Sequence, residues 1–277
     1  MREWLNRKNN FTPSDRIIAD FIVKNEDKLV FLTESEIGEL LQVSVATVSR
    51  FWRKIGYKNF KSYKIELAGN LEVTPADKMK NIITEVGVQD IAGMMLSREI
   101  DYMQQTFQRL DRNHFDKAVR LIEGAPRVHI HGAGPSASLS ELLRFRLNRY
   151  GKQAVVLPRS GSELFENLVN VRTGELFVVF GFFRSSPEIE VIQQFAKERG
   201  CPIILFTDLT VSEMIDASSC VLYACRGETK QFHSIVAPAA LVDALFVALT
   251  TKNEPDSVAR LNELYEMRKQ YRHLLIK

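Results

Sequence analysis

The sequence predicts an α/β protein in two parts: an all-helical domain over residues 1–76, then a three-layer α/β domain with a five-stranded parallel sheet over residues 77–277. Capped helical patterns fill the first part. From residue 127 onward, short apolar runs alternate with helical patterns, as in a parallel sheet covered on both faces. Charge divides the chain similarly, since residues 1–80 hold 14 Lys and Arg against 11 Asp and Glu, whereas residues 81–277 hold 23 of each. A basic first segment beside a neutral remainder indicates a small nucleic-acid reader joined to a domain with another task.

Two helix starts are recognisable near the beginning of the chain. Thr12 with Asp15, and Thr33 with Glu36, have the spacing of a capping box. The second helix is too short to be stable alone, so it must pack on its neighbours. The apolar residues expected to be buried by these two helices are Ile17, Ile18, Phe21, Ile22, Ile37, Leu40 and Leu41.

Residues 42–44 predict a tight turn into a third helix. Ser44 is suited to cap a helix over about residues 45–55, which Gly56 ends. Gly38 is small where two helices must cross closely. Gln42 occupies a position where glycine is usual, because the turn requires a left-handed backbone. This spacing is typical of a helix-turn-helix. The positions that must be apolar to hold the helix pair are occupied by Ile37, Leu41, Val43, Val48 and Phe51.

The other side of the third helix is polar and basic. No acidic residue occurs from residue 42 to residue 65, which is the electrostatic footprint that a polyanion needs. A solvated basic helix in an ordinary helical subdomain is the alternative. Because the start of a recognition helix enters the major groove deepest, Thr47 and Arg50 are expected to reach base edges. The other expected DNA contacts are Ser44, Ala46, Arg53, Lys54, Lys58 and Lys61, of which the last four are expected at phosphates.

The string VSVATVSRFWRKIGYKNFKSYK, residues 43–64, resembles the N-terminal domain of RpiR-type bacterial transcriptional regulators. The pattern SxATVxRFxxxxGYxxFxxxK is matched nearly throughout. The family joins this domain to a C-terminal sugar isomerase (SIS) fold that senses phosphosugars. The resemblance therefore implies that the rest of the chain is a SIS domain.

The second part begins after a linker with a proline at residues 72–77. Strands are expected at residues 127–131, 153–157, 176–181, 202–206 and 220–223. Helices are expected between them at residues 136–150, 162–170, 187–199 and 212–217. Ligands on such sheets bind beyond the carboxyl ends of the strands.

The first such end carries a glycine-rich loop, HGAGPSAS, at residues 131–138. Gly132 and Gly134 allow a tight turn, and Ser136 places a hydroxyl beside free amide groups, which predicts an anion cradle. The same letters fit a dinucleotide fingerprint. However, the next strand ends in Pro158 and Arg159 instead of the acid that would hold a ribose. An NADP site and a loop used only for close packing remain the alternatives.

Residues 127–157 resemble the first strand, loop and helix of SIS domains in RpiR-type regulators, and residues 212–223 and 237–249 resemble later family segments. SIS domains usually follow the third strand with S-x-S-G-x-T, but residues 181–188 here read GFFRSSPE. Arg184, with Ser185 and Ser186, is expected to replace the lost hydroxyl donors in an altered anion site. A pocket for a ligand other than a plain sugar phosphate is the alternative. His233, before the helix that approaches the pocket in this fold, is the last expected ligand contact.

A phosphosugar isomerase with an attached DNA-binding segment is the alternative function, since such enzymes need a pocket Glu or His as a base. His131, His233 and Glu163 are candidates, but no spacing pairs a histidine with a carboxylate, so no catalytic residue is predicted. No cofactor or metal is expected either. The cysteines, which lack metal-ligand spacing, are expected to be inert buried thiols. They are Cys201, Cys220 and Cys225.

No run approaches the roughly 20 apolar residues that span a bilayer, and the start of the chain lacks the apolar stretch of a signal peptide. These features predict a cytoplasmic protein without a membrane partner. The whole chain predicts a transcriptional regulator that binds double-stranded operator DNA and senses a phosphorylated sugar or related small anion. A homodimer or homotetramer is expected, because paired recognition helices about 34 Å apart read a palindromic site.

Overall fold

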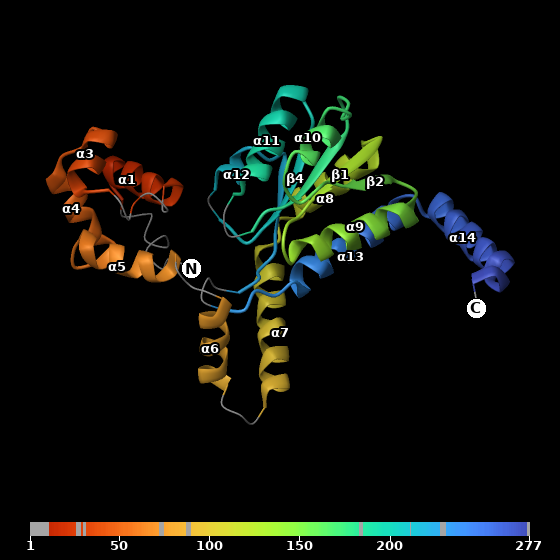
Figure 1. Ribbon diagram of the computed structural model, residues 1–277, viewed down its shortest axis with the longest axis horizontal. Coiled ribbons are helices and arrows are strands. Elements are labelled where there is room, and N and C mark those ends of the chain that lie inside the picture. The colour runs from red at the N-terminus through yellow and green to blue at the C-terminus, as the bar shows by residue number, and fades with distance from the viewer. Residues whose placement is uncertain are drawn as a thin grey trace. The chain divides into compact units, whose positions relative to one another are not determined.

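The computed structural model describes residues 11–25, 29, 32–71, 75–86, 90–182, 185–210, 212–227 and 231–275 (Figure 1). The chain divides into two compact units. One comprises Met1–Ile91 with Gly227–His233, and the other comprises Ala92–Arg226 with Ser234–Lys277.

The secondary structure of the first unit, in its described residues, is entirely helical. Its helices are α1 (Pro13–Lys24), α3 (Glu34–Leu41), α4 (Val45–Lys54), α5 (Phe60–Leu71) and α6 (Pro75–Val86). Both predicted capping boxes are confirmed, because the side chains of Thr12 and Thr33 accept from the amides of Asp15 and Glu36, whose carboxylates accept in return.

An aromatic cluster forms the centre of this unit. The Trp52 ring is completely buried and stacks on Phe60 at 4.6 Å and on Tyr63 at 4.8 Å between ring centroids. Two predictions about burial are wrong, since Ile17 is 48% exposed and Leu40 is 61% exposed. Ile17 lies on α1 and Leu40 on α3. Both helices are short, and the face that each turns toward the core is narrower than its set of apolar residues. The predicted residues that are fully buried are Ile18, Ile22, Ile37, Val48 and Phe51.

The second unit contains a five-stranded sheet in which every neighbouring pair is parallel, as predicted (Figure 1). The strand order is β2-β1-β3-β4-β5. The strands are β1 (Arg127–His131), β2 (Gln153–Val156), β3 (Leu176–Phe180), β4 (Ile203–Thr207) and β5 (Cys220–Tyr223). The helices are α7 (Ile91–Arg109), α8 (Arg112–Gly124), α9 (Ser136–Tyr150), α10 (Glu163–Leu168), α11 (Pro187–Arg199), α12 (Glu213–Asp216), α13 (Val236–Lys252) and α14 (Glu254–Leu275).

Alternation along the strands assigns a separate core to each face of the sheet. On one face, Ile130 and Val178 pack in a core with residues of α8, α9 and α13. On the other, Phe177 and Val179 pack with residues of α10, α11 and α12. This arrangement confirms the three-layer fold, and it places the side chains of His129 and His131 on the second face, beside Phe177 and Val179.

The three cysteines are free and buried, as predicted. Burial raises the pKa of Cys220 to about 11, which leaves almost no reactive thiolate at neutral pH. Among the described residues, no single helix has the length and apolar content to cross a membrane. Helices α13 and α14 meet that test only as a pair bent by 110°.

Candidate functional site

The turn between α3 and α4 has the backbone that its sequence position predicts. Gln42 has φ 54° and ψ 39°, the left-handed conformation, and it is the one residue other than glycine with positive φ in the described part of the chain. The next amide, of Val43, donates to the Gly38 carbonyl at 2.9 Å. A Cβ on Gly38 would lie 2.9 Å from the Val43 carbonyl oxygen, so only glycine permits this close approach.

Helix α4 begins at a well-formed cap. The Ser44 hydroxyl accepts from the Thr47 amide at 3.1 Å and lies 2.8 Å from the Thr47 hydroxyl. Arg50 folds back along the helix and donates from Nε to the Ala46 carbonyl at 3.2 Å. The cap, Thr47 and Arg50 therefore lie together at the start of the helix, as a recognition helix requires.

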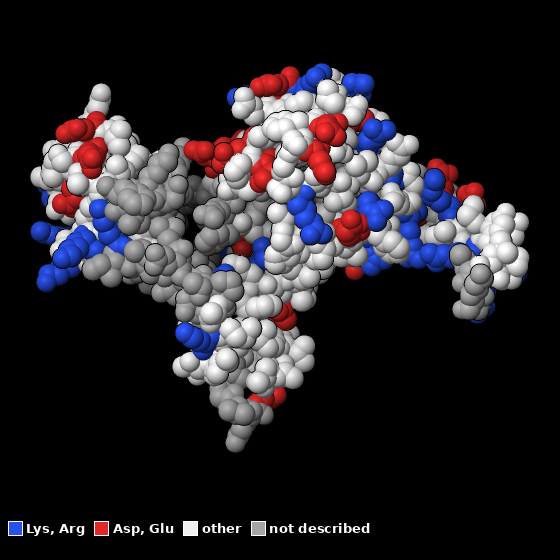
Figure 2. Space-filling view, in the orientation of Figure 1, with Lys and Arg blue, Asp and Glu red and all other residues white. Residues whose placement is uncertain are grey.

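Basic residues gather on the surface of the first unit that α4 forms. Figure 2 shows Lys and Arg side chains over α4, while the Asp and Glu side chains of the unit gather over α3. Burial on α4 follows the predicted division, because Val48, Phe51 and Trp52 are buried while Ala46, Arg50 and Arg53 are exposed. The last two predicted phosphate contacts, Lys58 and Lys61, are exposed as well.

Lys54 has a second role besides its predicted DNA contact. Its Nζ lies 2.6 Å from Asp15 Oδ2, so it ties the end of α4 to the capping box of α1. Burial raises the pKa of Asp15, but hydrogen bonds from Lys54 and Thr12 outweigh that effect and hold it below its ordinary value. The pair fixes the position of α4 relative to α1.

The sheet places two predicted ligand loops at its topological switch point. From β1 the chain crosses through α9 to β2 on one side, and from β3 it crosses through α11 to β4 on the other. Strands β1 and β3 are neighbours, so the loops that follow them, which begin at Gly132 and Gly181, leave the same edge side by side. Such a point in an open parallel sheet is the usual place for a ligand.

The glycine loop after β1 is packed more tightly than an open cradle. A Cβ on Gly132 would lie 2.7 Å from both the Ser136 carbonyl oxygen and the Ser140 hydroxyl, and Gly134 has φ 56°. The predicted free amides are absent at Ser136 and Ala137, because these amides donate to the Ala133 and Gly134 carbonyls. Ser136 itself is 4% exposed. The glycines thus serve close packing of α9 on β1, and the loop by itself offers few donors to an anion.

The loop after β3 is only partly described, and Arg184 lies outside the described residues. Ser186 caps α11 by accepting from the Ile189 amide at 3.3 Å. The Ser185 hydroxyl has a long contact, 3.4 Å, to the Ser186 carbonyl. Of these two serines, Ser185 is therefore the one whose hydroxyl is less engaged by the protein.

Two further groups lie at this edge: Arg226, which the sequence analysis did not single out, and His131, which it named only as a candidate base. Arg226, after β5, is 5% exposed, donates from Nε to the Ser234 carbonyl, and lies with its guanidinium 4.3 Å from the Phe182 ring centroid. His131 is 1% exposed, and the Pro158 carbonyl and the Glu188 carboxylate are the polar groups that act on its ring. The signal in the sequence for Arg226 is an arginine three residues after the end of β5.

The two groups differ in charge. Burial lowers the pKa of His131, and the Glu188 carboxylate and the Pro158 carbonyl offset this only in part, so the imidazole is neutral at pH 7. Burial also lowers the pKa of Arg226, but an arginine keeps its charge in proteins. Arg226 is thus a buried cation at the edge where the two loops meet.

His233, the last predicted ligand contact, belongs to the first unit. Its ring nitrogens lie 3.2 and 3.4 Å from Lys78 Nζ in α6. No cluster of three or more His, Cys, Asp or Glu side chains suited to a metal ion occurs within the described ranges.

Comparisons with known proteins match both parts of the chain. Residues 3–73 match the helix-turn-helix domain of the rpiR family, and residues 121–248 match the SIS domain. A curated relative, the uncharacterized HTH-type transcriptional regulator YbbH of Bacillus subtilis, is 24% identical over 251 residues, which cover 88% of each chain.

Two solved structures share the fold. The Vibrio vulnificus NanR protein complexed with ManNAc-6P aligns over 96% of this chain and 97% of its own, with TM-score 0.62 and 24% identity. The sugar isomerase domain of the RpiR transcription factor from Sphaerobacter thermophilus aligns over 64% of this chain and 99% of its own, with TM-score 0.61 and 26% identity.

Proposed function

Because this chain joins an rpiR-family helix-turn-helix domain to a SIS domain, we propose that it is a cytoplasmic transcriptional regulator. Its first unit binds double-stranded operator DNA through α4. Its SIS domain binds a phosphorylated sugar or related small anion, and that ligand changes the affinity for the operator. A ligand does so only if it binds the two arrangements of the protein with different affinity.

The observation that carries the DNA-binding proposal is the combination of charge and geometry at α4. The helix starts at a capped turn of the required left-handed form, and no acidic residue occurs from residue 42 to residue 65. A solvated basic helix would explain the charge but not the turn. Thr47 and Arg50 are the proposed base contacts, and Arg53, Lys58 and Lys61 are the proposed phosphate contacts.

Operator binding is testable with the full chain and a fragment selected from a pool of genomic DNA by the protein itself. Arg50→Ala should weaken binding to that fragment by about 1–3 kcal/mol, and Lys58→Ala should lower the salt slope of the affinity by about one. Lys197→Ala, which removes an exposed charge from α11, is the matched control. Unchanged affinity in the Arg50→Ala variant together with an unchanged salt slope in the Lys58→Ala variant would refute the proposal.

The ligand proposal depends on the carboxyl edge of the sheet. The loops after β1 and β3 meet there at the switch point, and the buried cation Arg226 offers the charge that an anion needs. The likeness to the Vibrio vulnificus protein, which was solved with ManNAc-6P, supports a sugar phosphate as the ligand class.

A thermal-shift screen of phosphorylated sugars and sugar acids tests this site. A binding ligand should raise the melting temperature of the full chain, by an amount that grows with ligand concentration. Arg226→Gln and Ser136→Ala should each reduce the shift, while Lys197→Gln should retain it. If no phosphorylated compound shifts the melting temperature, the ligand proposal fails and the DNA-binding proposal stands alone.

A homodimer or homotetramer is part of the proposal, because one small domain binds DNA weakly and a palindromic site is read by two recognition helices. Light scattering after size exclusion measures this directly, and a monomer at the concentrations used for DNA binding would contradict it.

A phosphosugar isomerase is the second candidate, and the neutral, buried His131 near Glu188 favours it, since a general base needs a pKa near or below the working pH. Turnover of ketose and aldose phosphates that His131→Gln abolishes would establish this alternative. Absence of turnover with a compound that binds in the thermal-shift screen would exclude it for that compound.

A further inference from the structure

A polar cavity lies at the amino edge of the sheet, opposite the edge from which the proposed ligand loops leave. It has a volume of about 520 Å³, and two arginines, two asparagines, a histidine and a glutamate line it. Arg127 begins β1, and Glu175 directly precedes β3, so both lie where the parallel strands start. The proposed ligand loops leave these strands at their other ends. This cavity is therefore a separate place on the same domain.

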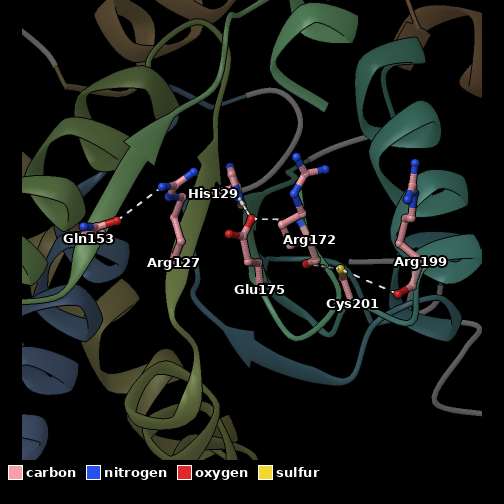
Figure 3. Close-up of polar contacts among 7 residues, drawn as sticks. All are labelled: Arg127, His129, Gln153, Arg172, Glu175, Arg199 and Cys201. Carbon is pink, nitrogen blue, oxygen red and sulfur yellow. Dashed lines mark hydrogen bonds and ion pairs between the residues drawn. The ribbon is translucent and has the colours of Figure 1, made fainter. Parts of the chain in front are cut away.

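The floor of the cavity is a buried, hydrogen-bonded pair of a histidine and a glutamate. His129 and Glu175 are 4% and 5% exposed, and His129 Nε2 lies 2.7 Å from Glu175 Oε2 (Figure 3). The same oxygen accepts from the Arg172 amide at 3.1 Å, which fixes the backbone of Arg172 at the rim. Burial raises the pKa of Glu175, but these hydrogen bonds outweigh that effect and lower it. Apolar side chains would fill this space at least as favourably, so packing alone does not account for the pair.

One buried polar atom at the cavity lacks a partner. Among the described residues, no group forms a hydrogen bond with His129 Nδ1, although the imidazole is almost completely enclosed. Leaving such an atom unsatisfied costs free energy, which a ligand or a bound water recovers.

Two guanidinium groups stand beside this histidine. In Figure 3 the nitrogen-bearing ends of Arg127, His129 and Arg172 point the same way, above the Glu175 carboxylate. Arg127 makes one long contact, 3.3 Å, to Gln153 at the sheet edge, and Arg172 is exposed. Two arginines against one carboxylate give the cavity a positive charge, and guanidinium groups bind oxyanions in bidentate geometry.

The asparagines supply acceptors. The side-chain NH₂ groups of Asn167 and Asn170 donate to the carbonyls of Glu163 and Glu166 at 3.0 and 2.8 Å, one turn earlier along the chain. Their side-chain oxygens remain available to accept from hydroxyl groups next to a bound anion.

We propose that this cavity is a second small-molecule site, which binds a phosphate oxyanion between Arg127 and Arg172. The ligand is either free phosphate or a phosphate monoester whose hydroxyl groups reach Asn167 and Asn170. The proposal is independent of operator binding and of the ligand at the carboxyl edge.

Calorimetric titration of the full chain, at constant ionic strength, with inorganic phosphate and separately with glycerol 3-phosphate tests the site. Saturable binding should weaken at least tenfold in the Arg127→Gln, Arg172→Gln double variant. It should be unchanged in the Arg120→Gln, Lys197→Gln double variant, which removes two exposed charges from α8 and α11. Tighter binding of glycerol 3-phosphate than of phosphate identifies a monoester site, and equal or weaker binding identifies a site for free phosphate.

The Ser136→Ala variant separates this cavity from the carboxyl edge, because it should leave the phosphate affinity unchanged. Lack of phosphate binding, equal loss in both double variants, or loss in Ser136→Ala with retention in the arginine variant would each overturn the proposal. The melting temperature without ligand checks that the arginine variant is folded, and Arg172→Gln alone, at an exposed position, repeats the test if it is not.

Discussion

Helix α4 and the carboxyl edge of the sheet gather their polar groups over very different lengths of chain. The cap, Thr47, Arg50 and Arg53 lie on one helix and the residue before it, and most are exposed. The edge combines His131 at the end of β1, Ser185 after β3 and Arg226 after β5. The first surface exists wherever its helix forms. The second exists only when the strands are assembled in their order. Its residues can therefore be identified from the tertiary structure, but not from the pattern of residues within one segment of the sequence.

The largest expected effect comes from removing a core side chain beneath α4. It tests whether the surface of α4 depends on its own unit alone. Trp52→Ala leaves a large cavity among Phe60, Tyr63 and their neighbours, and should cost about 3–5 kcal/mol. We expect the first unit to unfold at lower temperature, with loss of DNA binding, while the transition of the SIS domain stays in place. Scanning calorimetry measures both. Phe165→Ala, at a 59% exposed position on α10, should stay within about 0.5 kcal/mol. A common shift of both transitions would contradict the independence of the two units.

Each unit has a glycine where an added Cβ would lie very close to a neighbouring oxygen atom, so the cost of adding a methyl group can be compared between the two units. Gly38→Ala places a Cβ 2.9 Å from a carbonyl oxygen in the first unit, and Gly132→Ala places one 2.7 Å from two oxygens in the second. Each should cost about 1–3 kcal/mol, the range for overpacking, in its own unit only. Denaturant titrations followed by circular dichroism give both values. A tolerated Gly132→Ala would mean that α9 can move away from β1 without loss.

Acid should act on both units through different carboxylates. The pKa of Asp15 and the pKa of Glu175 lie below their ordinary values in the folded protein. The folded state therefore binds fewer protons than the unfolded state, and each group stabilises the fold above its ordinary pKa. That stability is lost as the pH falls below about 5, where these carboxylates become protonated. Asp15→Asn should reduce the loss of stability of the first unit at acid pH, and Glu175→Gln should reduce that of the second unit. Both are measured as the free energy of unfolding against pH. An unchanged slope in either variant would show that another carboxylate is responsible.

The smallest expected effect concerns two residues with the same backbone. Gln42 has φ 54° in the turn before α4, and Gly134 has φ 56° in the loop before α9. Gln42→Gly should stabilise the first unit by about 0.5–1 kcal/mol, because it removes the left-handed strain, and Gly134→Ala should destabilise the second by a similar amount. Destabilisation by Gln42→Gly in the same denaturant titrations would show that the Gln42 side chain contributes more than its backbone costs.

The elements that local chemistry specifies were predicted closely. Strands β1 and β5 and helices α9 and α11 have the predicted bounds, and the capping residues Thr12, Thr33 and Ser44 act as predicted. Caps and strand alternation depend on residues within a few positions of one another, so a sequence pattern carries them completely.

Predictions that depended on distant packing were less accurate. Ile17 and Leu40 are exposed, because periodicity marks an apolar helix face without showing how much of it a neighbour covers. The amides of Ser136 and Ala137 form hydrogen bonds to carbonyls within the glycine loop, which the sequence alone did not reveal. Arg226 and the His129–Glu175 pair were missed because their contacts are with residues tens of positions away in the sequence.

By itself, the sequence determined the order of helices and strands, the capped turn before α4 and the acid-free surface of the first unit. These features follow from the backbone preferences and charges of residues that are close along the chain. Tertiary structure decided which charged groups are buried and where they meet. Only the strand order brings the ends of β1, β3 and β5 to one edge, and the starts of β1 and β3 to the other. Burial then gives Arg226 and the His129–Glu175 pair an environment that no local pattern specifies.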